Sequence, residues 1–186
     1  MAVTTTNLIM GPADLYIGAF GATEPLDTAV NTTPAASSWT DLGGTQDGVK
    51  LTVDQTYTPL EVDQIVDEPG ARLTKRMFTI ETNLAEATLE NLKYLLNDGT
   101  AASGAGFKSF EPIYASSATQ PTYRAVILDG YAPNQLRRRF IIRRCLSNDK
   151  VESTYKKDGQ TLFTVKWQGF YVSSVIAPFK LVDATS

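Results

Sequence analysis

The stretch "DLGGTQDGVKLTVDQTYTPLEVDQIVDEPGARLTKRMFTIET" covers residues 41–82 and carries the strongest strand signals of the sequence. Turn-forming pairs at Asp47-Gly48, Thr58-Pro59 and Pro69-Gly70 divide it into three extended runs. In each run apolar residues alternate with charged or hydroxyl residues, so each strand has one apolar and one polar face. We therefore predict antiparallel strands with one face on a core and the other in water.

The second of these runs, residues 58–70, is predicted to be an exposed strand with an acidic side. Glu61, Asp63 and Asp67 share one parity, and the opposite parity is mostly apolar. Three interpretations of Glu61 and Asp63 are open: a catalytic or metal-binding pair, a solvated surface, or an electrostatic lining. A catalytic pair needs one carboxyl in an apolar pocket, and the exposed pattern supplies none.

The rest of the chain completes a mainly β fold. Further strands are expected over residues 13–21, 122–131, 137–146, 150–157 and 160–174. A single helix is expected over residues 83–99, with Asn83 and Glu86 as its cap pairing and a leucine stripe facing the sheets. The prediction is an antiparallel β-sandwich or open barrel with one flanking α-helix, a single domain over residues 1–186.

Two segments without periodicity are expected to be surface loops, at about residues 21–40 and 100–122. Both are rich in small and hydroxyl residues. The second is expected to hold a short strand around residues 110–114.

Composition excludes several kinds of chemistry. The 186 residues contain no histidine, which removes Ser-His and Cys-His catalysis and His-ligated zinc. The one cysteine, Cys145, is expected to be a packed residue with no disulfide partner. No apolar run is long enough to span a membrane, and the start "MAVTTTNLIMGP" lacks the features of a secretion signal. We expect a non-enzymatic protein made in a cytoplasm, without cofactor, metal site, catalytic residues or membrane insertion.

Charge is distributed unevenly along the chain. Residues 1–100 hold 14 acidic and 5 basic residues, a balance of -9, and residues 101–186 hold 6 acidic and 12 basic residues, a balance of +6, which together give the net charge of -3. This polarity can be neutralised within one domain, or it can place opposite charges on surfaces that meet between copies.

The stretch "NQLRRRFIIRRCL" concentrates five of the arginines on one predicted strand. Such a strand can bind phosphates, but base-stacking aromatic residues are not interleaved with the arginines. Arginine also pairs well with carboxylates, so we favour pairing with acids of the same chain or of neighbouring copies.

Three motifs occur in an order and spacing that resemble a known family. They are "GPADLYIGAFGATEP", then "WTDLGGTQDGVKLTVDQTYTPLEVDQ", then "NLAEATLENL" after a further strand. Together they resemble the major tail tube proteins of bacteriophages with long, flexible, non-contractile tails. The resemblance extends over about residues 11–97, and the remainder matches only through its meander of strands.

The resemblance implies a structural virion protein in the phage tail. It implies a β-sandwich with a flanking helix, hexameric rings whose inner sheets close into a barrel, and rings stacked into a hollow tube. The implied partners are other copies of the chain, the tape measure protein, the tail terminator and tail tip proteins, and double-stranded DNA that passes through without specific binding. The alternative from a different class is a small-ligand-binding β-barrel.

Under this resemblance the polar faces of the strands would line the channel, with a mixture of charges and an acidic excess. An acidic or hydroxyl lining would let DNA slide, whereas a basic lining would hold its phosphates. The expected lining residues are Lys50, Thr52, Asp54, Glu61, Asp63, Lys75, Thr79 and Glu81. The expected contacts between subunits or rings are Asp67, Glu68, Arg72, Arg137, Arg138, Arg139, Arg143 and Arg144.

Overall fold

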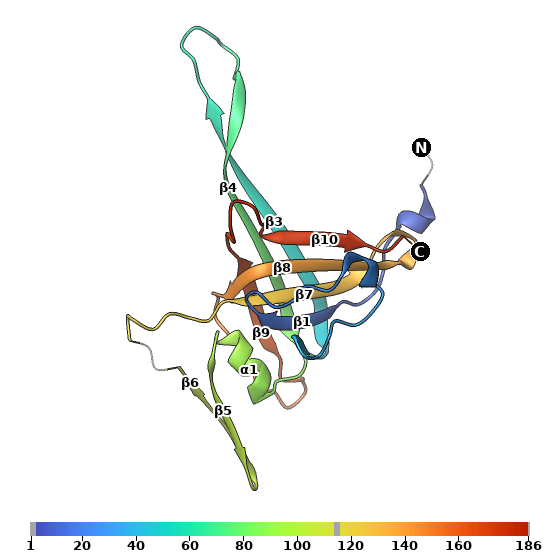
Figure 1. The fold of residues 1–186 in the computed structure, drawn as a ribbon, viewed down its shortest axis with the longest axis vertical. Helices are drawn as coiled ribbons and strands as arrows, with labels where there is room; N and C mark the ends of the chain where they lie inside the picture. Colours follow the sequence, from blue (N-terminus) through green and yellow to red (C-terminus); the bar gives the residue numbers. More distant parts are fainter. Residues whose placement is uncertain (1–2, 114–115, 186) are drawn as a thin grey trace.

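The computed structural model describes residues 3–113 and 116–185 and shows a mainly β protein. Within these residues, eight strands form one sheet, two more form a separate hairpin, and a single α-helix lies beside them. All strand pairs are antiparallel. The predicted class, an antiparallel β-sandwich with one flanking helix, is confirmed (Figure 1).

The large sheet has the strand order β2-β1-β7-β8-β9-β4-β3, with β10 also paired to β8. Its strands are β1 Asp14–Ala19, β2 Trp39–Asp41, β3 Thr45–Leu60, β4 Gly70–Leu84, β7 Arg124–Tyr131, β8 Arg137–Ser147, β9 Phe163–Gly169 and β10 Phe179–Asp183. Short 3-10 turns lie at Thr5–Asn7, Asp27–Ala29 and Pro133–Gln135.

Strand β8 joins two layers of this sheet. Its first part pairs with β7 on one side and with β10 on the other, whereas Cys145, Leu146 and Ser147 pair with β9. Figure 1 shows β3, β4 and β9 crossing the direction of β1, β7, β8 and β10. One continuous sheet therefore folds over itself and encloses a core between its two layers.

The core is filled by the apolar faces of both layers. Its fully buried members include Leu15, Leu42, Ile80, Leu84, Leu95, Val126, Ile142 and Trp167. Gly169 lies so close to the Phe78 ring that a Cβ there would be 1.6 Å from the ring carbon Cε2, so only glycine fits. A ligand-binding barrel needs these faces to line a cavity, but here they pack against one another.

A second apolar cluster lies on the opposite face of β1, β7 and β8. Tyr16, Trp39, Ile127 and Ile141 are buried there, beneath the segment 20–38. The Trp39 indole donates a hydrogen bond to the Thr23 carbonyl at 3.0 Å, which ties this segment to the sheet. The expected loop at 21–40 is thus a cover for one face of the sheet.

Strands β3 and β4 extend well beyond the sandwich as a two-stranded arm, defined here as residues 54–77 (Figure 1). Strand β3 continues without a break through Asp47-Gly48 and Thr58-Pro59, the two pairs expected to be turns. Asp47 and Gly48 adopt positive φ at a bulge, and Pro59 is tolerated because β3 is an edge strand.

The prediction of an exposed strand over residues 58–70 is wrong. Strand β3 ends at Leu60, which pairs with Gly70, and residues 61–69 form the tip loop of the arm. Within the loop, the Ile65 N–H donates to the Val62 carbonyl at 3.1 Å and closes a turn. The turn places Asp63 in its bend, a position that aspartate favours, and this ends the alternation.

The helix is shorter than predicted and has a different cap. Helix α1 spans Leu89–Leu95, and the Thr88 hydroxyl accepts a hydrogen bond from the Asn91 N–H. Asn83 lies at the end of β4, and Glu86 instead accepts a hydrogen bond from Gly44 N–H at 3.2 Å. The predicted leucine stripe holds for Leu95 and Leu92, but Leu96 is exposed.

The segment expected to be a loop at 100–122 begins with a hairpin. Strands β5 Gly99–Gly104 and β6 Phe107–Pro112 pair with each other and project away from the body (Figure 1). The Phe110 ring covers the backbone of Gly99, so a glycine in a strand gains an aromatic contact. The short strand expected at 110–114 is part of β6, although Tyr114 lies outside the described residues.

The carboxyl-terminal strands also differ from prediction. Residues 150–157 form no strand and contribute only isolated bridges, from Glu152 to Thr164 and from Lys156 to Gly159. Strand β9 ends at Gly169, and β10 follows Pro178 without having been predicted. Residues 150–157 alternate only weakly in hydrophobicity, so they have no apolar face to pack on the core as a strand of the sheet would.

Candidate assembly surfaces

A polar face runs across β3, β4 and β9 on the side opposite the core. Directly paired residues point to the same side of an antiparallel sheet, and Glu81 pairs with both Lys50 and Lys166. In the next row, Thr79 pairs with Thr52 and with Gln168. The neighbouring row, Leu51, Ile80 and Trp167, points to the other side. We call residues 50, 52, 79, 81, 166 and 168 the polar face.

An ion-pair triad crosses the three strands of the polar face. The Lys166 Nζ lies 2.7 Å from Glu81 Oε1, and the Lys50 Nζ lies 3.6 Å from Glu81 Oε2. The hydrogen bond from Lys166 is the largest cause that holds the pKa of Glu81 below its ordinary value; burial opposes it, and the charges of both lysines add to the lowering. The same contact raises the pKa of Lys166. Both lysines thus share one carboxylate.

The predicted lining residues fall into three groups. Lys50, Thr52, Thr79 and Glu81 belong to the polar face, and the structure brings them together, although Thr79 is buried, with 3% exposure. Asp54 and Lys75 lie on the arm, where they face Met77 and Thr56. Glu61 and Asp63 lie in the tip loop, roughly 30 Å along the strand from Lys50. The acidic strip is therefore not continuous with the polar face.

Sequence reasoning missed the contribution of β9 to this face. Lys166 and Gln168 complete its two rows, and Thr164 extends it by donating a hydrogen bond to Asn83 Oδ1 at 2.8 Å. The sequence did indicate a polar side for this strand, because residues 163–169 alternate between large apolar and polar side chains.

The arm carries charges of both signs in separate places. The stem carries mostly basic residues and the tip loop acidic ones, all exposed: Arg72, Lys75 and Arg76 with Asp54 on the stem, and Glu61, Asp63, Asp67 and Glu68 in the tip loop. Among the residues that the structure describes, none of these eight makes an ion pair. The tip loop also exposes the apolar side chains of Val62, Ile65 and Val66.

Four of the five arginines of β8 pair with carboxylates of the same chain. Arg139 binds Asp129 through two hydrogen bonds of 2.7 and 2.6 Å, and its side chain is only 2% exposed. Arg138 binds Asp183 through two bonds of 2.6 Å, which raises the pKa of Arg138. Arg143 pairs with Glu24, and Arg137 lies 3.9 Å from Asp14. Pairing within the chain accounts for these four; contacts between copies stay a prediction.

Arg144 is the exception on this strand. Its guanidinium lies over the Tyr123 ring, 3.8 Å from the ring centre, and 5.6 Å from that of Phe20. Nη1 donates to the Tyr171 carbonyl at 3.1 Å, while the buried Nε has no hydrogen-bond partner among the described residues. Arg144 is thus held in place by aromatic rings rather than by a carboxylate.

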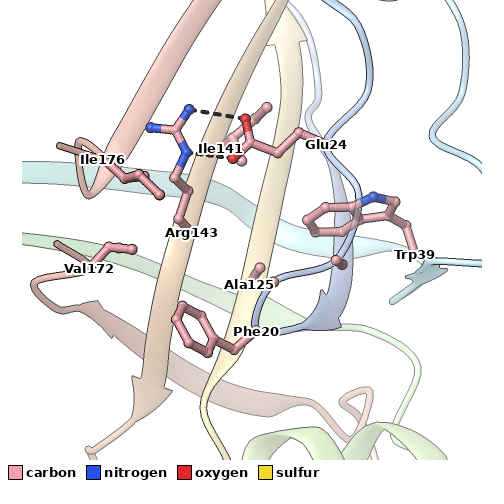
Figure 2. A pocket seen from close by; sticks show the side chains of 10 residues that line it. Phe20, Glu24, Trp39, Ala125, Ile141, Arg143, Val172 and Ile176 are labelled. Atoms are coloured by element: carbon pink, nitrogen blue, oxygen red, sulfur yellow. Dashed lines mark hydrogen bonds and ion pairs between the residues drawn. The ribbon is translucent and has the colours of Figure 1, made fainter.

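A cavity of about 230 Å³ opens beside this arginine on the outer face of the sheet. Figure 2 shows Phe20, Trp39, Ala125, Ile141, Val172 and Ile176 around it, with the Arg143 and Glu24 pair along one wall. We call it the outer pocket. Its walls come from β8, β7, Trp39 of β2, the loop after β9 and the segment 20–38, which we call the covering segment.

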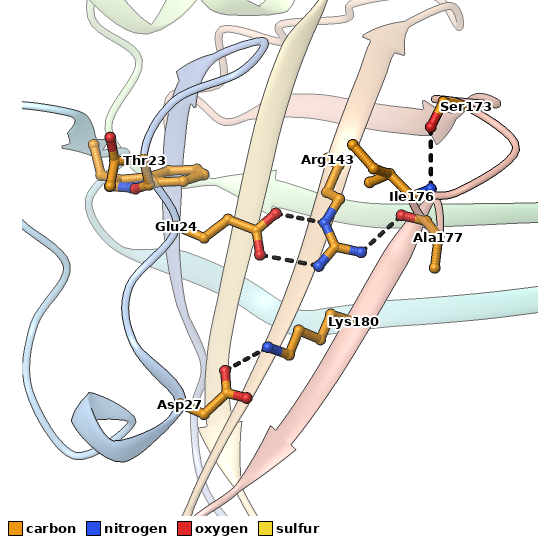
Figure 3. Close-up of polar contacts among 9 residues, drawn as sticks. Thr23, Glu24, Asp27, Arg143, Ser173, Ile176, Ala177 and Lys180 are labelled. Carbon is orange, nitrogen blue, oxygen red and sulfur yellow. Dashed lines mark hydrogen bonds and ion pairs between the residues drawn. The ribbon is translucent and has the colours of Figure 1, made fainter.

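Polar contacts fix the walls of the outer pocket. Arg143 Nη1 donates to the Ala177 carbonyl at 2.7 Å, and the Ser173 hydroxyl accepts a hydrogen bond from the Ile176 N–H at 3.0 Å (Figure 3). Lys180 reaches across to Asp27. Both the covering segment and the loop 170–178 are therefore anchored to the sheet, so the pocket has a defined shape.

The described residues offer little for catalysis or metal binding. Among residues 3–113 and 116–185, no three His, Cys, Asp or Glu side chains cluster as metal ligands would. Cys145 is buried, burial raises the pKa of its thiol, and its Sγ donates to the Arg124 carbonyl at 3.3 Å. Within the same residues, none of the helices has the length and hydrophobicity to cross a membrane.

A comparison with protein families gives a match over nearly the whole chain. The family model described as "Phage tail tube protein" matches residues 1–173 of the 186. No curated protein sequence matches significantly. The match covers the polar face, the arm, helix α1 and strands β1 to β9.

Proposed function

The chain belongs to the phage tail tube protein family, and on that premise we propose that its copies form hexameric rings that stack into the hollow tube of the tail. In this proposal DNA passes through the tube during ejection. The tape measure protein occupies the channel beforehand, and terminator and tip proteins close its ends. The polar face of β3, β4 and β9 carries the proposal, because it is a sheet surface of paired ions, hydroxyls and amides on the side opposite the core.

The edge of the large sheet supports assembly through the same strands. Strand β3 pairs with β4 only, so the 16 residues of Thr45–Leu60 leave their other edge without a strand partner in the described chain. An exposed edge of this length is a template for pairing with another chain. Closing it against a neighbouring copy would continue the polar face from one subunit to the next around a ring.

The chemistry of the polar face suits a surface along which DNA slides. DNA carries about one negative charge per 1.7 Å of its axis, and unpaired lysines would bind its phosphates. Here Lys50 and Lys166 share Glu81, and the other accessible groups are the Thr52 hydroxyl and the Gln168 amide, since Thr79 is buried. Glu81 offsets one of the two lysine charges, so the polar face keeps a net charge of +1 in place of the acidic excess expected from the sequence. A single remaining charge gives only a weak contact with the phosphates.

Electron microscopy of the purified protein tests the proposal. Concentrated protein in negative stain should show rings or hollow rods, and image averaging gives the ring symmetry. A species that stays monomeric at high concentration, by light scattering and in images, would contradict the proposal.

Cysteine accessibility tests which face lines the channel. Because the native Cys145 is buried, an introduced thiol is the main site for a bulky polymer-linked maleimide. Thr52→Cys should react in the monomer and be protected in assembled tubes, whereas Val175→Cys, on an exposed loop, serves as the control. Equal reactivity of Thr52→Cys in tubes and monomers would show that the polar face is not in the channel.

A further inference from the structure

The tip loop of the arm exposes apolar side chains among its carboxylates. Val66 is fully exposed, with Ile65 at 53% and Val62 at 44%. Figure 1 shows the arm projecting away from the body, so the tip does not reach the pocket of its own chain. Apolar groups gathered at the end of a projecting hairpin are typical of a surface that binds another molecule.

The outer pocket has the complementary chemistry. It is concave, mostly apolar and about 230 Å³ in volume, which is room enough for an aliphatic side chain. Ile176 at its rim is 46% exposed. Hydrogen bonds anchor its walls before any ligand binds, so little conformational entropy would be lost on filling it.

Arg144 adds a charge that matches the tip loop. It stacks on Phe20, which lines the pocket, and it is the arginine of β8 for which the described residues provide no carboxylate. Glu61, Asp63, Asp67 and Glu68 in turn have no cationic partner among those residues. An arginine held in place by aromatic rings can bind a carboxylate with little loss of side-chain entropy.

We propose that the tip loop of one copy docks into the outer pocket of a second copy. An aliphatic side chain from Ile65 or Val66 fills the pocket, and an acidic residue of the loop binds Arg144. This inference rests on the proposed function, because two different surfaces joined head to tail build rings or stacks, as in a tube, rather than a two-fold dimer. The occupant is therefore a second copy of this chain rather than a small molecule.

A matched pair of substitutions tests the pocket. Ile176→Glu places a negative charge at the pocket rim facing an acidic tip, and Val175→Glu places the same charge on the next residue, which does not line the pocket. Both side chains are exposed, so both variants should fold. Ile176→Glu should raise the protein concentration at which tubes form by about tenfold or more, as loss of a central interface residue does. Val175→Glu should leave it within about twofold.

Disulfide trapping identifies the occupant. A variant with Val66→Cys and Ile176→Cys, oxidised with diamide after assembly, should give a ladder of dimers, trimers and higher species on a non-reducing gel. The ladder arises because each chain carries one tip and one pocket. Val66→Cys with Phe107→Cys, on the separate hairpin, is the control and should give no ladder.

The outcomes separate this contact from the proposed function. Tubes that form from Ile176→Glu as readily as from wild type, or equal losses from Ile176→Glu and Val175→Glu, would overturn the docking contact and leave the tube proposal in place. The same holds if the control pair crosslinks as well as the test pair. A wild-type protein that never assembles would overturn both.

Discussion

Strand β8 and the arm both carry dense charge, but the two regions differ in where that charge finds its partners. On β8, four arginines bind carboxylates of the same chain, and the Arg139 side chain is almost entirely buried. On the arm, eight charged residues have no ion-pair partner among the described residues. A charge-rich sequence therefore does not by itself mark an interface. Charges already paired stabilise the subunit, and unpaired ones are available to other copies.

The largest effect is expected from removing the tip of the arm. Leu60 pairs with Gly70, so an Asn-Gly pair in place of residues 61–69 would close the hairpin with a two-residue turn. The subunit should keep its thermal stability, because the tip loop is exposed, but it should lose the ability to form tubes. Circular dichroism melting and electron microscopy measure the two properties. Intact tubes from the shortened protein would show that the arm's unpaired charges are not used in assembly.

The next effect is expected at the buried ion pair of β8. Arg139→Met removes the partner of Asp129 and leaves a carboxylate in a site where Asp129 is only 6% exposed. Breaking one side of a buried pair costs about 3–5 kcal/mol of the free energy of unfolding. Urea denaturation of the monomer measures this loss.

A double variant separates burial from pairing at the same site. Arg139→Met with Asp129→Leu removes both charges, and replacing a buried pair by apolar residues is often close to neutral. The double variant should therefore recover most of the stability. If it is as unstable as Arg139→Met, the hydrogen bonds from Arg139 to the Thr32 and Ala29 carbonyls, rather than the ion pair, hold the covering segment.

A smaller loss of stability is expected from a substitution at the wall of the outer pocket. Arg143→Met removes the paired hydrogen bonds to Glu24 and the bond to the Ala177 carbonyl. Arg143 is 17% exposed and Glu24 31%, so solvent weakens the pair, and the expected cost is about 1–2 kcal/mol. Urea denaturation should place this variant between wild type and Arg139→Met. A loss as large as that of Arg139→Met would contradict the ranking by burial.

The sequence was sufficient to predict what depends on local alternation. The alternation of sides along residues 49–57 and 78–81 is as predicted, because neighbours along a strand must point to opposite sides. On the apolar side, Val49, Phe78 and Ile80 pack on the core, but Leu51, Val53 and Tyr57 are exposed, so the predicted burial of that side of β3 is wrong for these three. Positions of turns were harder to predict. Asp47-Gly48 and Thr58-Pro59 read as breaks but are absorbed by a bulge and by a free sheet edge, and an edge exists only once the whole sheet is formed.

For the candidate surfaces too, contacts between neighbouring strands could be predicted and contacts between distant segments could not. Half of the expected lining residues meet on the polar face, because they belong to two strands that pair directly. The outer pocket and the pairing of β8 could not be predicted, since Arg143 meets Glu24 across 119 residues and Arg138 meets Asp183 across 45. Contacts between such distant residues depend on the order of strands in the sheet, which local patterns do not fix.

The smallest effect is expected at the exposed end of β8, where it depends on pH. The hydrogen bond from Arg138 and its charge hold the pKa of Asp183 below its ordinary value of 3.8. The unfolded chain therefore binds a proton more readily than the folded one. The stability from this pair is fully present above the ordinary pKa and is lost as pH falls through the lower pKa of the folded state.

Comparing Asp183→Asn with wild type between pH 2 and pH 6 measures this contribution by urea denaturation. Wild type should be more stable at the upper end of the range and lose that advantage toward the lower end. Because Asp183 and Arg138 are each about one third exposed, solvent screening keeps the difference below about 1 kcal/mol. A difference that does not change with pH would mean that Asp183 acts through packing at the end of β10. In that case the pairing of β8 with its own chain would rest mainly on the buried Arg139, and the exposed arginines of that strand would resemble those of the arm.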